Sequence, residues 1–320
     1  MWHKHFHPVS SELFFRSQKT GDPRFGEISR CISKGTPQKS SYLIAGYPDD
    51  DGITLNSGRP GAKLAPDAIR SRFYKTSPSS FHQEDLQLVD IGNLDTQLNL
   101  EDRHKEAKTA VQSALENNHR WIGLGGGHDY GYPDGAGFLL ANKDSKLKPL
   151  ILNFDAHLDV RPTDKGLSSG TPFYRLLTEK DLPAFEFYEI GIQSQCNSKS
   201  HFQWLKDHGG KLISFEEIMM SGQTQSQYIL NQLSELLVKR RPTYISIDID
   251  GFSSAYAMGC SQSWSTGFIP NQIFPLFNIL FQRLNVQALG IYEVSPPLDQ
   301  DEATVKLASQ IIHQFLGPIG

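Results

Sequence analysis

Apolar segments rich in β-forming residues recur along the chain, and several are nearly continuous rather than alternating. They lie at residues 42–46, 86–91, 121–124, 149–154, 187–192, 211–215, 244–249 and 288–294. Strands buried on both faces of a parallel sheet show this pattern. Segments with a helical period lie between them, the clearest being residues 225–240. The alternation predicts a three-layer α/β/α domain with a mostly parallel sheet of about eight strands.

The length of 320 residues fits one large domain. We expect a single catalytic domain over residues 36–320, preceded by an N-terminal extension over residues 1–35. His3, His5 and His7 alternate near the start of this extension. We interpret them as part of a frayed tail rather than as a metal site.

Charge and apolar content narrow the class of partner. The net charge is −4 and the 31 basic residues are scattered, which favours a small molecule over nucleic acid or an anionic membrane. No apolar stretch reaches the ~20 residues of a membrane helix, and the first residues lack the apolar core of a signal peptide. We expect a cytoplasmic protein with three reduced cysteines, and a homo-oligomer is compatible with the sequence. Cys260 has no base near it in sequence and is not a favoured nucleophile.

Ligand-type side chains follow three of the predicted strands. They occur in Gly125-Gly126-Gly127-His128-Asp129, in Asp155-Ala156-His157-Leu158-Asp159 and in Asp248-Ile249-Asp250. In the second cluster, Asp155, His157 and Asp159 are alternate residues, and alternate residues of an extended chain project to one side. Ligands of parallel α/β sheets bind at the carboxyl ends of the strands, where these clusters lie. A single acid there could equally cap a helix or form an ion pair.

Six such groups together favour a metal centre: His128, Asp155, His157, Asp159, Asp248 and Asp250. Packing alone would not gather four acids at strand ends, and without cations they would repel one another. Carboxylates and imidazoles without thiolates favour manganese over zinc. The ligand count fits two metal ions that share bridging carboxylates.

The motifs GGGHD, DAHLD and SIDID, in this order, resemble the signatures of the arginase (ureohydrolase) superfamily over residues 42–299. The resemblance implies two Mn²⁺ per chain. His128, Asp155, Asp159 and Asp248 would hold one ion, and Asp155, His157, Asp248 and Asp250 the other, with Asp155 and Asp248 bridging. It also implies that Glu293, in Tyr292-Glu293-Val294-Ser295-Pro296, holds the cationic part of the substrate. The alternative for Glu293 is a surface acid.

Within the superfamily, Ser168-Ser169-Gly170-Thr171-Pro172-Phe173 is similar to the formimidoylglutamase group. Arginase and agmatinase carry a histidine here, in SGNLHG and HGTMF, and this chain does not. Further likeness lies in residues 58–62 together with 66–70, in Val160-Arg161 after the second motif, and in Gly191-Ile192-Gln193 followed by Asn197. The loop at residues 251–261 lacks the Asp-Pro pair of arginases, which leaves specificity open.

The resemblance implies cleavage of N-formimino-L-glutamate to L-glutamate and formamide, a step of histidine degradation. This substrate has two carboxylates, so its pocket needs basic groups. Arg161, two residues beyond the second motif, is the first candidate, with Arg59 and Arg175 as further candidates that could equally form structural ion pairs. By its place in the motif, Asn197 is a further candidate for the substrate pocket. Asp159 would orient the attacking hydroxide and pass its proton to the departing nitrogen.

Three other interpretations remain open. A guanidino-acid ureohydrolase, acting on guanidinobutyrate or guanidinopropionate or resembling agmatinase, would use the same chemistry but release urea. A non-catalytic binding protein on the same fold is disfavoured because all six ligand positions are filled. The zinc deacetylases that share the fold are disfavoured because their paired histidines are absent.

Overall fold

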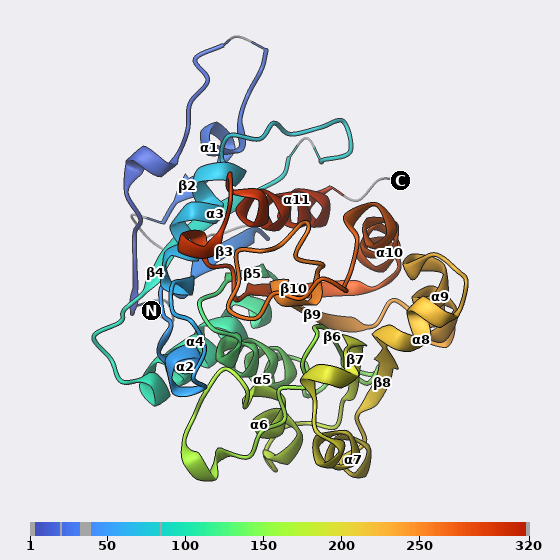
Figure 1. The fold of residues 1–320 in the computed structure, drawn as a ribbon. Coiled ribbons are helices and arrows are strands. Elements are labelled where there is room, and N and C mark those ends of the chain that lie inside the picture. Colours follow the sequence, from blue (N-terminus) through green and yellow to red (C-terminus); the bar gives the residue numbers. More distant parts are fainter. Residues whose placement is uncertain (1–3, 20, 33–39, 84, 318–320) are drawn as a thin grey trace.

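A single twisted sheet runs through the molecule (Figure 1). The computed structural model describes residues 4–19, 21–32, 40–83 and 85–317. Within these residues the strands are β1 (Phe6–His7), β2 (Arg30–Cys31), β3 (Tyr42–Gly46), β4 (Leu88–Leu94), β5 (Arg120–Leu124), β6 (Leu150–Phe154), β7 (Glu186–Ile192), β8 (Lys211–Ser214), β9 (Pro242–Asp248) and β10 (Asn285–Tyr292). Their order is β1-β4-β3-β5-β10-β9-β6-β7-β8, and β2 also pairs with β4.

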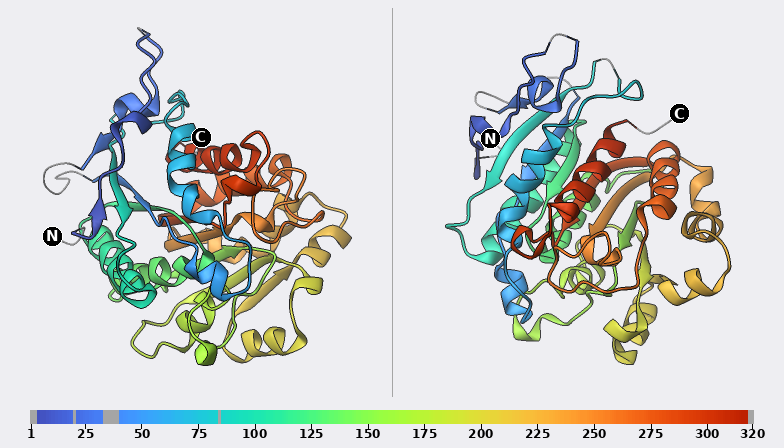
Figure 2. Two further views of the ribbon diagram at one scale, coloured as in Figure 1. Left: turned by 60° about the vertical axis from the view of Figure 1, so that its left-hand side comes forward. Right: turned by 45° about the horizontal axis from the view of Figure 1, so that its top comes forward.

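Helices cover both faces of the sheet, as the two views in Figure 2 show. The described α-helices are α1 (Phe25–Ile28), α2 (Asp51–Leu55), α3 (Ala65–Phe73), α4 (Leu100–Glu116), α5 (Gly131–Ala141), α6 (Pro172–Thr178), α7 (Lys199–Asp207), α8 (Phe215–Met220), α9 (Gln225–Gln232), α10 (Pro270–Arg283) and α11 (Ala303–Leu316). None of these described helices combines the length and apolarity needed to cross a membrane.

Successive residues of the strands point into two separate apolar cores. Ile44 packs with α3, α10 and α11 on one face, whereas its neighbours Leu43 and Ala45 pack with α4 and α5 on the other. Burial on both faces explains why strands such as β6 are apolar at nearly every position. The predicted three-layer α/β/α architecture is therefore confirmed.

The N-terminal segment is more ordered than a frayed tail, so that interpretation was wrong for its described part. Phe6 is buried, and β1 pairs antiparallel with β4. Gly92 permits this pairing, because its φ is +93° and a Cβ there would lie 1.9 Å from the carbonyl oxygen of His7. His5 and His7 each lie 3.6 Å from a carboxylate, of Glu106 and Asp95 respectively. His3 and the expected boundary at residue 35 lie outside the described residues.

The continuous helix predicted over residues 225–240 was also wrong. Helix α9 ends at Gln232, and a short 3₁₀ helix follows at Ser234–Val238. The amide of Leu236 donates to the carbonyl of Leu233, which is the i to i+3 bond of a 3₁₀ turn. Apolar residues three or four apart suit either kind of helix, so the spacing could not separate them.

The strand order brings the chemically interesting segments to one edge of the sheet. The final strand, β10, lies in the middle, parallel to both β5 and β9, and β9 pairs in turn with β6. Parallel strands end at the same edge. The first two motifs follow β5 and β6, the third begins at the last residue of β9, and Glu293 follows β10, so all of them meet there.

Candidate metal centre

The three glycines after β5 are needed because the chain passes tightly against its neighbours. A Cβ on Gly126 would lie 1.7 Å from the carbonyl oxygen of Asp49. The turn delivers His128, which is fully buried and stacks on Tyr292 at 5.0 Å between ring centroids. Its Nε2 lies 2.9 Å from the Ser246 hydroxyl, which leaves Nδ1 to face the acids.

Four side chains form the first candidate ligand group around this nitrogen. The Nδ1 atom of His128 lies 3.0 Å from Asp155 Oδ2, 3.0 Å from Asp159 Oδ2 and 3.1 Å from Asp248 Oδ2. The ligand atoms of all four residues lie within 4.8 Å of one another. These are the four residues assigned to one ion from the motifs.

Three side chains form the second candidate group. His157 Nδ1 lies 3.0 Å from Asp250 Oδ2 and 3.6 Å from Asp155 Oδ1. Asp155 belongs to both groups, with Oδ2 facing the first and Oδ1 facing the second, an arrangement that a bridging carboxylate can adopt. Asp248, the other expected bridge, falls only in the first group, and its Oδ1 accepts a hydrogen bond of 2.9 Å from the amide of Asp250.

The electrostatics of this pocket fit a pair of divalent cations. Burial raises the pKa of Asp159 and Asp248 above the usual value, and raises that of Asp250 to about 6. Burial acts the same way on Asp155, but hydrogen bonds from His128 and His157 hold its pKa below the usual value. Asp250 Oδ1 is buried and has no hydrogen-bond partner among the described residues, and His128 Nδ1 faces three carboxylate oxygens at once. Cations between these atoms would satisfy them and offset the repulsion.

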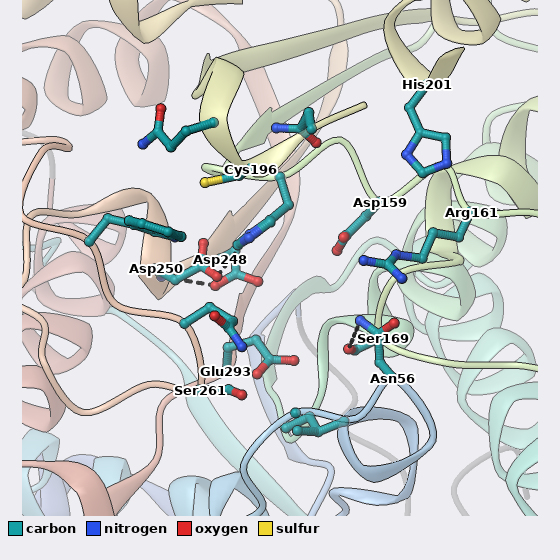
Figure 3. A pocket seen from close by; sticks show the side chains of 17 residues that line it. Asn56, Asp159, Arg161, Ser169, Cys196, His201, Asp248, Asp250, Ser261 and Glu293 are labelled. Atoms are coloured by element: carbon teal, nitrogen blue, oxygen red, sulfur yellow. Dashed lines mark hydrogen bonds and ion pairs between the residues drawn. The ribbon is translucent and has the colours of Figure 1, made fainter. Parts of the chain in front are cut away.

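Two residues of the site have backbone conformations that side chains rarely adopt. Asp159 has a φ of +46° and Glu293 a φ of +64°. Each such residue costs on the order of 1–3 kcal/mol and is typical of functional sites. In both cases the turn directs a carboxylate toward the same space, as Figure 3 shows.

Glu293 is buried at the end of β10, so the surface-acid alternative was wrong. It is 6% exposed, and its Oε1 accepts a hydrogen bond of 3.1 Å from the amide of His128. Burial raises the pKa of Glu293 to about 8. Its side chain lines the same cavity as the candidate ligands.

A polar cavity of about 300 Å³ opens above the ligand groups (Figure 3). Candidate ligands His157, Asp159, Asp248 and Asp250 lie in its wall. The other lining residues are Ile53, Asn56, Gly58, Arg161, Ser169, Gln195, Cys196, Asn197, His201, Ser261, Gln262, Trp264 and Glu293. Polar lining suits a small charged substrate rather than an apolar one.

The structure separates the three candidate arginines. Arg161 lines the cavity, and its guanidinium forms no hydrogen bond or ion pair with the described residues. Arg59 lies outside the lining and donates to the carbonyls of Cys260 and Ser261. Arg175 also lies outside it, with its guanidinium 3.3 Å from the ring centre of Tyr132. Arg59 and Arg175 are therefore engaged in structural contacts, and we no longer propose them as substrate ligands.

Asn197 lines the cavity, but its amide serves the backbone of the second motif. Its Oδ1 accepts from the amide of Leu158, and its Nδ2 donates to the carbonyls of Ala156 and Gln193. It positions the turn that carries the candidate ligands, and its amide has little capacity left for substrate.

Sequence reasoning missed several lining residues, including Asn56, His201 and Trp264. They lie on α2's C-terminal end, on α7 and on the loop before α10, and no spacing in the sequence links them. Ser169 was within reach of sequence reasoning, because it belongs to the SSGTPF segment, and its hydroxyl accepts from Asn56 at 3.1 Å.

Comparisons with known proteins identify the family of this chain. The model of the arginase family matches residues 40–317. A formimidoylglutamase of Legionella pneumophila (strain Paris) is 34% identical over 280 residues, which are 86% of this chain and 84% of that protein. One from Clostridium tetani is 30% identical over 287 residues, covering 88% and 83%. The crystal structure of Trypanosoma cruzi formiminoglutamase with Mn²⁺₂ superposes with a TM-score of 0.79 at 26% identity, covering 93% of this chain and 98% of that one. The chain therefore belongs to the arginase family.

Proposed function

We propose that this protein hydrolyses N-formimino-L-glutamate to L-glutamate and formamide, with two Mn²⁺ per chain. One observation carries the choice of substrate: the unpaired guanidinium of Arg161 lines the same cavity as both candidate ligand groups of the described chain. A dicarboxylate amidine would pair with it. The formimidoylglutamase relatives and the manganese-bound Trypanosoma cruzi structure support the proposal.

The two ligand groups would hold the cations, with Asp155 between them. When bound, a pair of divalent cations lowers the pKa of a water molecule and so supplies hydroxide near neutral pH. The chain's own residues hold that site in shape. Ser246 fixes the ring of His128, and Asn197 fixes the turn that carries His157.

Glu293 binds the cationic amidine. Its burial favours the neutral acid, but an amidinium beside it favours the ionised carboxylate, so substrate and Glu293 stabilise each other's charge. The amide of His128 keeps one oxygen of Glu293 in place. The formimino carbon is thereby held over the ligand groups.

Asp159 moves the proton. Its Oδ2 lies 3.0 Å from His128 Nδ1, at the edge of the first ligand group, and its side chain also reaches the cavity. Oxygen from water joins the formimino carbon, the bond from that carbon to the glutamate nitrogen breaks, and Asp159 passes a proton to that nitrogen. Formamide and L-glutamate leave, which balances the reaction.

The test is a substrate screen on the manganese-loaded protein against formiminoglutamate, arginine, agmatine and guanidino acids. Formamide released from formiminoglutamate supports the proposal, whereas urea released from a guanidino acid as the preferred reaction would overturn it.

Arg161→Met tests the carboxylate contact. Loss of a charged hydrogen bond, worth about 1.5–3 kcal/mol, should raise KM for formiminoglutamate about 10- to 100-fold with metal content unchanged. Lys165→Met is the control, since Lys165 is an exposed cation on the same loop outside the cavity. A KM within about twofold of wild type would remove Arg161 from the substrate site.

A further inference from the structure

We propose that His201 binds the substrate together with Arg161, and that the two side chains form the part of the cavity that selects a dicarboxylate. This inference rests on the proposed function. Figure 3 shows Arg161 and His201 beside each other on one side of Asp159, with Glu293 on the other side. A substrate whose amidine meets Glu293 therefore extends its acidic end toward Arg161 and His201.

The backbone of His201 is fixed by the start of α7. Ser198 caps this helix, and its hydroxyl accepts a hydrogen bond of 3.3 Å from the amide of His201. The side chain is partly buried and lines the cavity. Within the described part of the chain, no hydrogen bond or ion pair is found for the imidazole. The fold thus holds the backbone that carries this ring, and the ring remains available to bind a ligand.

Arg161 is held from the opposite side by the SSGTPF segment. Its amide donates to the carbonyl of Gly170 at 2.8 Å. A Cβ on residue 170 would lie 2.7 Å from Cδ and 3.0 Å from Nε of Arg161. The side-chain stem of Arg161 therefore occupies space that any side chain at residue 170 would fill.

The two side chains offer complementary donors. Burial and the nearby guanidinium lower the pKa of His201, so the ring is neutral near pH 7 and offers one N–H donor. Arg161 offers a pair of N–H groups that match the two oxygens of a carboxylate. Together they can serve two carboxylates. A substrate with an uncharged or cationic tail would leave these donors unpaired and would bind less well.

Binding of glutarate to the manganese-loaded protein, measured by calorimetry, tests the inference without turnover. Glutarate has the two carboxylates of the substrate and no amidine. His201→Ala should weaken glutarate binding at least fivefold, and His201→Gln, which keeps an N–H donor, should restore most of it. His208→Ala is the matched control, because His208 ends the same helix but stacks on Trp204 outside the cavity.

Kinetics separate this inference from the proposed function. His201→Ala should raise KM for formiminoglutamate about five- to tenfold with kcat within twofold and metal content unchanged. If the wild-type protein hydrolyses formiminoglutamate but His201→Ala has the same KM and the same affinity for glutarate, the role of His201 is overturned and the proposed function stands. Wild type that binds glutarate through His201 but releases no formamide overturns the proposed function alone. Wild type that binds no glutarate overturns the dicarboxylate site.

Discussion

Gly170 shows how a missing side chain can determine substrate binding at the scale of a single residue. The φ angle of Gly170 lies outside the left-handed region, so an alanine there would strain the backbone little. The added Cβ would, however, collide with the side-chain stem of Arg161. We predict that Gly170→Ala raises KM for formiminoglutamate about threefold or more with kcat and metal content unchanged, as steady-state kinetics would reveal.

The double variant Gly170→Ala/Arg161→Met provides the control. If Gly170 acts through Arg161, the double variant should be no worse than Arg161→Met alone. Fully additive losses would contradict this mechanism.

Asp134 carries a pH dependence of stability. It is fully buried and accepts hydrogen bonds from Tyr47 and Tyr292, and burial raises its pKa from 3.8 to about 7. The unfolded chain therefore releases this proton at lower pH than the folded chain, and stability falls as pH rises from about 4 to 7. An asparagine side chain does not ionise, so the Asp134→Asn variant lacks this loss of stability. The free energy of unfolding of the variant should therefore rise relative to that of wild type between about pH 4 and pH 7, by at most about 4 kcal/mol.

Urea unfolding of both proteins at pH 4.5 and pH 8 measures this difference. The metal ligands are common to the two proteins, so their own titration cancels in the comparison. Two proteins whose stabilities change in parallel between these pH values would show that Asp134 does not titrate as described.

At the residue scale, the sequence located the candidate metal ligands because each lies at or just beyond the end of a buried strand. Arginines were harder to assign. Arg161, Arg59 and Arg175 have equally plausible spacing, but a long side chain reaches several partners, and only the fold shows that two of them are already engaged. His201 had no signal, because its helix meets the site only through the sheet topology.

At the scale of elements, the eight predicted strands were recognisable because burial on both faces makes them apolar throughout. The edge strands β1 and β2 were missed, since two residues are too few to show a period. The same N-terminal segment also supplies Phe25 to the main core, where it stacks on Phe73 at 4.7 Å. We propose that this segment folds with the rest of the domain rather than as a separate appendage.

Phe25→Ala tests that proposal. Deleting a fully buried phenylalanine costs about 3–5 kcal/mol, so the variant should unfold at a lower temperature while its folded fraction keeps wild-type activity. Phe15→Ala is the control from the same segment, because Phe15 is 38% exposed. Equal melting temperatures for the two variants in differential scanning calorimetry would contradict this role of Phe25.

At the scale of the whole molecule, the metal centre links two parts of the sheet. Removal of the metal should therefore lower the stability of the whole domain. Elemental analysis should find two manganese ions per chain. Chelation should lower Tm by about 5–10 °C, because saturating ligand contributes about 3 kcal/mol per site at a hundred times its Kd.

Asp155→Asn and Asp248→Asn should lose activity and metal, and their Tm should respond less to chelator. One ion per chain with full activity would refute the binuclear centre.

The central place of β10 has a consequence for the order of events during synthesis. It is the last strand to leave the ribosome, yet it alone joins β5, which precedes His128, to β9 and β6, which precede the other ligands. Until residues 285–292 emerge, nothing in the sheet holds these parts in register, and Glu293 is still absent. A nascent chain arrested before residue 285 should therefore retain less manganese after gel filtration than one that displays the full domain, because His128 is not yet held beside the other ligands. Equal retention by the two chains would contradict this order. The site thus forms late, after the other described strands of the sheet have been made.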